Sequence, residues 1–299
     1  MKLATVKKDG VSFVICEDRT EKLLHLARAN KEKYGEDHAF PSSMLAIIDG
    51  GKAEIERIKE LQSYAEGKPH LFLDKEEVVF EAPIPRPRKN IFCVGKNYKD
   101  HAIEMGSEAD IPEHIMLFTK APTTVIGTGE AIPNHASVTE QLDYEGEVAV
   151  VIGKTAKGVK REAAEDYIFG YTIINDVTAR DLQARHKQFF IGKSLDGSCP
   201  MGPYIVHKSS IQHPLKLQVQ TKVNGELRQN GNTGQFIFSI PEMIETLSKG
   251  MTLEPGDIIA TGTPAGVGKG FKPPRFLNSG DEIEITVEGL GTLANKVEF

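Results

Sequence analysis

Two glutamates, Glu145 and Glu147, stand at the start of an apolar run at residues 148–152. Alternate residues of a β-strand point to the same face, so we expect these two carboxylates to project side by side. Adjacent carboxylates repel each other unless a cation joins them or one of them binds a proton. Considered alone, the pair is more typical of two solvated acids at a strand end, because buried acids without a partner are rare.

A third acid makes a cation site the better interpretation. Asp176 follows another apolar segment at residues 171–175, so it too is expected at the end of a strand. Three carboxylates form an all-oxygen ligand set, which suits Mg²⁺ or Mn²⁺. Zinc sites more often contain His or Cys, and no such pair with ligand spacing occurs here. Asp176 alone is also compatible with a helix cap before Val177, but the three acids together favour a hard divalent cation.

His101 and Glu104 are candidates for acid–base chemistry. They stand three residues apart in a segment that is expected to be a short helix, after a strand that is expected to end at Gly95. Residues at this spacing share one helix face, where a carboxylate can orient an imidazole as a general base. The spacing alone is more typical of a surface ion pair, which is common and contributes little to stability.

A glycine-rich segment at residues 258–270 follows the pattern of a strand that runs into a loop. Its lysine suggests a phosphate-binding loop, whose motif begins with glycine and has Ser or Thr after the lysine. Here Thr263 occupies the first position and Gly270 the last, so the segment does not predict a nucleotide site. Exposed amides and hydroxyls in such a loop can still bind a carboxylate.

The N-terminal part of the chain shows one hairpin and two helical patterns. The first 18 residues alternate between apolar and polar side chains on both sides of the turn sequence KKDG, which predicts a β-hairpin. Residues 25–33 and 53–65 are expected to be helices, and the second has Ile55, Ile58 and Leu61 three residues apart.

Three prolines within residues 81–88 indicate a boundary, because proline removes a backbone donor and restricts the residue before it. We therefore expect a small α+β domain at residues 1–85 and a larger domain at residues 86–299. Short β-rich runs predominate in the larger part, and few helical segments, such as 161–167 and 241–248, interrupt them. This pattern predicts a mainly β fold with α+β elements, built on a barrel or rolled sheet.

Composition excludes several classes of protein. The chain has 299 residues, of which 39% are hydrophobic and 26% charged, as in ordinary globular proteins. No apolar run approaches the length of a membrane span, and the first residues carry charges instead of an export signal. Three widely spaced cysteines favour a reducing cytoplasm, and a net charge of −6 makes nucleic acid a poor partner. We expect a cytoplasmic protein without membrane insertion.

Taken together, the motifs resemble those of the fumarylacetoacetate hydrolase family over residues 89–299. Six segments match in one order, namely NIFCVGKNYKDHAIEMG, LDYEGEVAVVIGK, GYTIINDVTARDLQ, GKSLDGSCPMGP, KVNGELRQNGNT and GDIIATGTPAGVG. Within the family the chain is most similar to the bacterial acylpyruvase and oxaloacetate decarboxylase branch, which carries an extra N-terminal domain. The resemblance implies a rolled mixed β-sheet core and a homodimer.

The resemblance also implies a role for particular residues. Glu145, Glu147 and Asp176 would bind Mg²⁺ or Mn²⁺. His101 and Glu104 would form an acid–base dyad on a lid segment, and Lys193 would add positive charge at the reacting group. The further positions that match substrate contacts are Lys120, Gln183, Arg180 and Thr263, with Arg180 alternatively pairing with acids near the metal. Lys96 stands where relatives often have arginine, which affects the expected substrate preference.

The implied reaction is cleavage of the C3–C4 bond of a 2-oxo acid, in which the cation stabilises a pyruvate enolate. Oxaloacetate decarboxylation is the favoured expectation. The alternatives within the family are hydrolysis of an acylpyruvate such as fumarylpyruvate, in which His101 activates water, and a catabolic isomerase or decarboxylase reaction. A minor alternative, motivated by residues 1–85, is a partner-binding protein with secondary catalysis.

Overall fold

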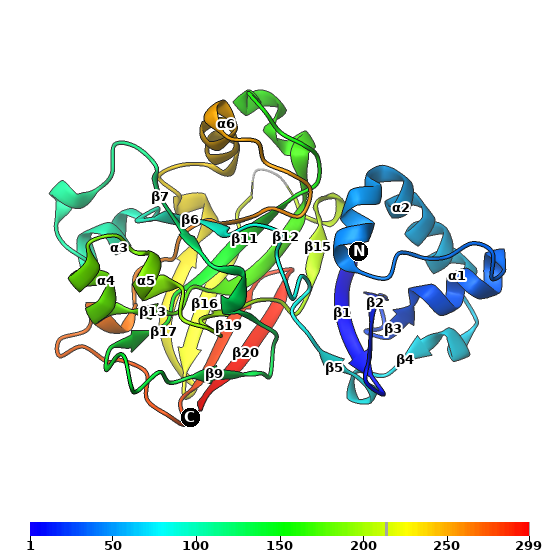
Figure 1. Ribbon diagram of the computed structural model, residues 1–299, viewed down its shortest axis with the longest axis horizontal. Coiled ribbons are helices and arrows are strands. Elements are labelled where there is room, and N and C mark those ends of the chain that lie inside the picture. Colours follow the sequence, from blue (N-terminus) through cyan, green and yellow to red (C-terminus); the bar gives the residue numbers. More distant parts are fainter. Residues whose placement is uncertain (213–214, 299) are drawn as a thin grey trace.

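The computed structural model describes residues 1–212 and 215–298, and one long mixed sheet runs through most of the molecule (Figure 1). Along this sheet the strands follow the order β4 (Phe72–Leu73), β3 (Leu23–His25), β2 (Val11–Glu17), β1 (Lys2–Lys8), β15 (Ile205–His207), β12 (Ile168–Asn175), β11 (Gly146–Ile152), β18 (Ile258–Ala260), β6 (Ile91–Gly95) and β7 (Met116–Lys120). A further strand, β5 (Val79–Phe80), pairs with β1. The pairs are antiparallel except β18 with β6, which is parallel.

A second sheet packs against the central strands of the first. Its order is β17 (Glu226–Asn232), β16 (Gln218–Val223), β19 (Glu282–Val287), β20 (Gly291–Glu298) and β9 (Ala131–Pro133). Two short pairs complete the strands of the described chain, namely β10 (Leu142–Asp143) with β13 (Thr178–Ala179), and β8 (Val125–Ile126) with β14 (Cys199–Pro200).

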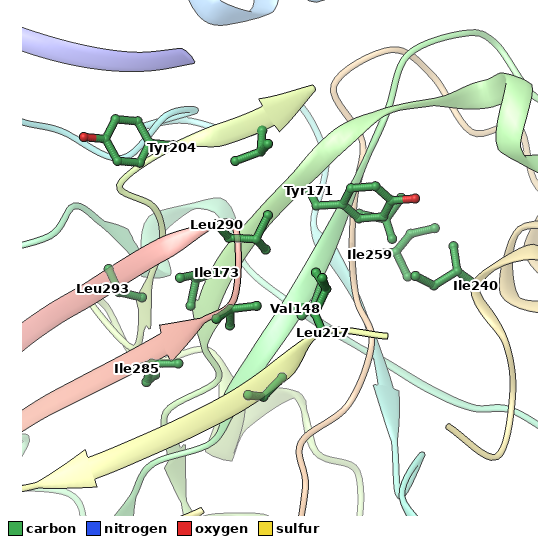
Figure 2. Close-up of a cluster of buried hydrophobic side chains, with 14 of the residues drawn as sticks. Val148, Tyr171, Ile173, Tyr204, Leu217, Ile240, Ile259, Ile285, Leu290 and Leu293 are labelled. Carbon is green, nitrogen blue, oxygen red and sulfur yellow. The ribbon is translucent and has the colours of Figure 1, made fainter. Parts of the chain in front are cut away.

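The largest apolar core lies between the two sheets. Every residue of β11 and β12 is buried, which explains why these strands are continuous apolar runs and do not alternate. Val148 on β11 and Ile173 on β12 belong to the same cluster as Ile285 and Leu293 of the second sheet, and Figure 2 shows these side chains together. Ala149, the neighbour of Val148, belongs instead to the cluster on the opposite face. Both faces of the central strands are therefore fixed by packing.

The N-terminal hairpin is confirmed, because β1 and β2 pair in register around Asp9 and Gly10, which both have positive φ. The first expected helix is also confirmed as α1 (Leu26–Tyr34). The second helix, α2 (Met44–Tyr64), begins well before residue 53 because Ser43 accepts a hydrogen bond from the Ala46 amide as its cap. A kink at Gly51, where φ is 55°, interrupts its periodicity.

The long sheet continues from the N-terminal region into the rest of the chain. Leu3 of β1 lies opposite Ile205 of β15, and Figure 1 shows β1 beside β15 at the side that carries α1 and α2. The division of the chain at residue 85 stays a prediction.

The remaining helices are short. They are α3 (Lys99–Glu104), α4 (Arg180–His186), α5 (Phe190–Lys193) and α6 (Ile240–Gly250). The 3₁₀ helices are Pro69–Leu71, Lys75–Glu77, Glu108–Asp110, Pro122–Thr124, Arg161–Tyr167, Lys208–Ser210, Thr233–Gln235 and Gly268–Gly270. The expected mainly β fold with α+β elements is confirmed. Within the described residues, no helix is both long enough and apolar enough to cross a membrane.

Candidate active site

Three buried carboxylates meet where β11 begins and β12 ends. Gly146 lies opposite Asn175 in the antiparallel ladder, so Glu145 and Asp176, the residues just outside it, are neighbours. The Asp176 amide donates a hydrogen bond of 2.8 Å to the Glu145 carbonyl oxygen. Glu147, the second residue of β11, joins them, and one oxygen of each acid lies within 4.8 Å of the others. The structure thus brings together the three acids that the sequence singled out.

Polar contacts hold this corner of the sheet in place. The Glu145 amide donates to Asn175 Oδ1 at 3.0 Å, and the Gly146 amide donates to Gln229 Oε1 at 3.0 Å. Any larger residue at 146 would force a shift, because a Cβ there would lie 2.3 Å from Thr221 Oγ1. The strand ends are therefore tied to each other and to the second sheet.

Three buried cations surround two of the acids. Lys193 Nζ lies 2.6 Å from Glu145 Oε2 and 2.7 Å from Asp176 Oδ2. Arg180 Nη2 lies 2.7 Å from Glu145 Oε1, and Lys120 Nζ lies 2.9 Å from Asp176 Oδ1. Burial raises the pKa of Glu145, but Lys193 and Arg180 outweigh it and hold this pKa well below its usual range.

Glu147 is different, because no cation within the described residues pairs with it. Its Oε2 accepts a hydrogen bond of 2.7 Å from the Gly262 amide. Burial raises the pKa of Glu147 well above its usual value, and the charges of Asp176 and Glu145 raise it further. This carboxylate therefore needs either a proton or an additional cation.

The buried charges indicate that a divalent cation fits here. The buried carboxylates at this site are Asp143, Glu145, Glu147 and Asp176. The buried cations that pair with them are Lys120, Arg180 and Lys193. Among the described residues, one more negative than positive charge is therefore buried here, and the three acids offer oxygen donors at ligand spacing. Such a donor set suits Mg²⁺ or Mn²⁺.

The expected acid–base pair lies on α3, beside the acids. His101 is buried and lines the same cavity as Glu145 and Glu147. Its Nδ1 lies 3.4 Å from Glu104 Oε2, which leaves Nε2 free to exchange a proton with a ligand. The Gly266 amide donates hydrogen bonds to both carboxylate oxygens of Glu104, at 2.9 and 3.1 Å. Glu104 thus links the imidazole to the glycine-rich loop.

The glycine-rich loop directs its amides at carboxylates of the protein itself. Besides the Gly262 and Gly266 amides, those of Gly268 and Lys269 donate to Asp143 at 2.7 and 3.0 Å. Thr263 Oγ1 donates to the Gly146 carbonyl at 2.9 Å. The loop therefore fixes the strand ends and the dyad relative to each other.

A cavity of about 190 Å³ opens between these elements. Of the residues predicted from the sequence, those that line it are Lys96, His101, Glu145, Glu147, Arg180, Gln183, Lys193 and Thr263. Apolar contacts come from Val94, Met105, Phe118, Ala184 and Phe189. Asp176 and Glu104 lie behind this lining and contact residues within it. Lys120 also lies behind it, bonded to Asp176 and to the Val177 carbonyl, so its role toward substrate stays a prediction.

Two supporting residues were not predicted. Asp143 is fully buried, and its carboxylate accepts a hydrogen bond of 2.8 Å from Arg180 Nε. It also accepts hydrogen bonds from the amides of Gly268 and Lys269. Gln229 bridges the Gly146 amide and Thr263 Oγ1, the latter at 2.7 Å from its Nε2. Asp143 stands two residues before Glu145 in a conspicuous acidic segment, and Gln229 lies within the matching segment KVNGELRQNGNT, so a signal was available for both residues.

Comparison with known proteins gives consistent results. Residues 90–298 match the family model described as the C-terminal domain of fumarylacetoacetate (FAA) hydrolase. Oxaloacetate tautomerase YisK of Bacillus subtilis is 57% identical over 302 residues, which cover 99% of this chain and all of the relative.

Solved structures show the same fold over the whole chain. A fumarylacetoacetate hydrolase from the psychrophile Exiguobacterium antarcticum has a TM-score of 0.84 at 41% identity, with 100% of this chain and 99% of that chain covered. Maleylpyruvate hydrolase from Sphingobium sp. SYK-6, in complex with manganese(II) and pyruvate, has a TM-score of 0.77 at 28% identity with the same coverage.

Proposed function

Because the chain belongs to the fumarylacetoacetate hydrolase family, we propose that it is a divalent-metal-dependent enzyme that interconverts the enol and keto forms of oxaloacetate. The observation that carries the proposal is the meeting of three buried carboxylates, two of which line one cavity together with His101. The full-length relative named as an oxaloacetate tautomerase, 57% identical, supports this choice of reaction within the family.

The reaction moves one proton from oxygen to carbon and breaks no bond between heavy atoms. In the enol form, C2 carries a hydroxyl and is doubly bonded to C3. The hydroxyl proton leaves, and a proton adds to C3. A cation held by Glu145, Glu147 and Asp176 would stabilise the negative charge that develops on the 2-oxygen. Mg²⁺ and Mn²⁺ are both compatible with this ligand set.

His101 is proposed to deliver and remove the proton at C3. It lines the cavity, and its Nδ1 faces Glu104, which can stabilise the imidazolium when Nε2 takes up a proton. The ammonium of Lys193 lies between Glu145 and Asp176 at the cavity wall and adds positive charge near the 2-oxygen. Gln183, Arg180 and Thr263 also line the cavity and are proposed to contact the substrate.

Oxaloacetate decarboxylation, the reaction favoured from the sequence, is the second candidate. It also places negative charge on the 2-oxygen, so the same carboxylates and Lys193 would serve it. The structural neighbour that contains manganese(II) and pyruvate is a hydrolase, so it supports a cation and a pyruvate unit in one site, which decarboxylation and hydrolysis share. Tautomerisation ranks first because its support comes from a much more similar relative that spans the whole chain.

Hydrolysis of an acylpyruvate requires His101 to activate a water molecule, in place of exchanging a proton with C3. The hydrolases among the structural neighbours support this reaction at lower sequence identity. The three reactions are distinguished by product. Tautomerisation releases none, decarboxylation releases CO₂, and hydrolysis releases a second acid.

We also propose that the protein forms a homodimer. Three large apolar side chains on neighbouring elements, Leu117 of β7 with Phe190 and Ile191 of α5, are 39–48% exposed. Exposed apolar groups are typical of interaction sites where they gather on one surface. Light scattering after gel filtration tests the dimer, and Phe190→Asp is the variant expected to shift it to monomer.

The function itself is tested by following the enol absorbance of freshly dissolved oxaloacetate while CO₂ and pyruvate are measured in the same samples. The proposal predicts rapid loss of the enol signal with little pyruvate. Stoichiometric pyruvate at the same rate would favour decarboxylation, and release of acetate from acetylpyruvate at higher efficiency would favour hydrolysis.

A further inference from the structure

Four cationic side chains line the cavity, and three of them are paired with acids of the protein. Lys193 and Arg180 contact Glu145, as described above. Lys96 Nζ lies 3.2 Å from Asp110 Oδ1. Within residues 1–212 and 215–298, the ammonium of the fourth, Lys269, has no carboxylate at ion-pair distance. Among the cations of the cavity lining, Lys269 is therefore the one whose ammonium no acid of the described residues pairs with.

The backbone of Lys269 is fixed although its side chain is exposed at the rim. The residue is the middle of the 3₁₀ helix Gly268–Gly270, and its amide donates to Asp143 Oδ2 at 3.0 Å. Partial burial lowers the pKa of the Lys269 ammonium, and the nearby Arg180 lowers it further. An anion placed against this ammonium would relieve both effects.

We propose that Lys269 binds the second carboxylate of a dicarboxylic 2-oxo acid and thereby makes the site selective for dicarboxylic over monocarboxylic substrates. The inference rests on the proposed function and deepens it. A dicarboxylate such as oxaloacetate has one carboxylate beside the 2-oxo group and another beyond C3. The first would lie against the cation that Glu145, Glu147 and Asp176 would hold, and near Lys193, so the second extends toward Lys269 at the exposed side of the cavity.

Lys96 is the nearest competitor for this role, since it also lines the cavity. Asp110 already balances its charge, so a substrate carboxylate would have to displace that acid before gaining the interaction. At Lys269, a substrate carboxylate would not have to displace an acid of the protein in this way. The unpaired lysine is therefore the better receptor for a dianion.

The test compares Lys269→Met with the unaltered enzyme, both loaded with Mn²⁺. We expect KM for oxaloacetate to rise at least tenfold while kcat changes less than threefold, because the group contacts a part of the substrate that does not react. The inhibition constant of pyruvate, which lacks the second carboxylate, should stay within twofold. Lys269→Arg should recover most of the lost affinity. Lys272→Met is the matched control, because Lys272 lies on the same segment but does not line the cavity.

Two results would overturn the inference. An unchanged KM in Lys269→Met would show that the ammonium does not meet the substrate. An equal loss of affinity for pyruvate and oxaloacetate would show only a general attraction of anions to the cavity. Failure of the proposed function is a separate result, in which the unaltered enzyme does not accelerate enol loss. In that case, calorimetry would measure the Kd of fresh oxaloacetate and the Kd of pyruvate for the Mn²⁺-loaded proteins. The inference still predicts that Lys269→Met weakens the binding of oxaloacetate but not that of pyruvate.

Discussion

Gly146 lies directly opposite Asn175 in the ladder of β11 and β12, and this single pairing determines where the buried acids meet. Because this is the last pair of the ladder, Glu145, just before β11, and Asp176, just after β12, come together at one corner of the sheet. A slip of one residue in this register would turn the side chains of one strand to the opposite face. The position of the site therefore depends on strand pairing more than on any loop.

Gly146→Ala should destabilise the protein and weaken metal binding together. The new Cβ would lie 2.3 Å from Thr221 Oγ1 and 3.1 Å from Ile285 Cγ2, so the strand end must move. Overpacking of this kind costs about 1–3 kcal/mol of unfolding free energy. Urea denaturation and calorimetric titration with Mn²⁺ measure the two effects. Gly250→Ala is the control, because a Cβ there meets no atom within 4 Å.

In metal-free protein, Glu147→Gln and Glu145→Gln should affect stability in opposite ways. Among the residues that the structure describes, no cation forms an ion pair with Glu147, and burial raises its pKa, so removal of its charge should leave the unfolding free energy level or raise it. Glu145 pairs with Lys193 and Arg180, and loss of one member of a buried ion pair typically costs about 3–5 kcal/mol.

Urea denaturation in the presence of EDTA measures the unfolding free energy of the two metal-free variants. In a separate calorimetric titration, both variants should fail to bind Mn²⁺. An equal loss of stability in the two variants would contradict the described difference in their pairing.

The sequence predicted the three acids because strand periodicity and burial are local properties. It offered the pairing of Arg180 with acids near the metal as one alternative, but it did not predict that Lys193 and Arg180 both contact Glu145. These contacts join segments 48 and 35 residues away from Glu145 in the chain. The early start of α2 was missed for a local reason. Adjacent glycines at 50 and 51 interrupt the helical pattern, although Ser43 supplies a cap.

The role of the glycine-rich loop was predicted only in part. Its sequence indicated that amides and hydroxyls would be available for a carboxylate, but it did not indicate which carboxylate. In the structure the amides of Gly262, Gly266 and Gly268 bind Glu147, Glu104 and Asp143. Those acids lie more than 100 residues away, so only the folded chain brings them within reach.

Stability should fall as the pH drops through the range in which two partly buried histidines gain protons. Burial lowers the pKa of His25 to about 4, with help from Arg28, and burial likewise lowers that of His207 to about 4. Both titrate near 6.5 in the unfolded chain, so between pH 6.5 and 4 the unfolded state binds more protons. The stability present above pH 6.5 is therefore lost as the pH falls.

Urea denaturation between pH 5 and 6.5, above the range in which ordinary carboxylates titrate, measures this loss. His25 also caps α1, since its Nδ1 accepts a hydrogen bond of 3.3 Å from the Arg28 amide. Protonation of Nδ1 would remove this acceptor. His25→Gln should flatten the pH dependence by about half, because one of two comparable groups is removed. An unchanged slope in this variant would assign the dependence to other groups.

His101→Ala should lower kcat for tautomerisation strongly and leave Mn²⁺ affinity nearly unchanged. The imidazole is placed to exchange the C3 proton, and general acid–base catalysis is worth roughly 10²–10⁴-fold in rate. The metal ligands are separate residues, so calorimetric titration with Mn²⁺ should give a Kd within a few-fold of the unaltered value. Full tautomerase activity in His101→Ala would remove this residue from the proton transfer.

The most direct test of the account measures enol loss from fresh oxaloacetate with the unaltered enzyme, with Glu147→Gln and with Mn²⁺ alone. Free divalent cations act on oxaloacetate unaided, so the metal-only rate is the baseline. We predict that the unaltered enzyme with Mn²⁺ exceeds this baseline by orders of magnitude, and that Glu147→Gln falls back to it. An enzyme no faster than Mn²⁺ alone, or a Glu147→Gln variant that keeps full activity in EDTA, would contradict the proposed metal-dependent tautomerase.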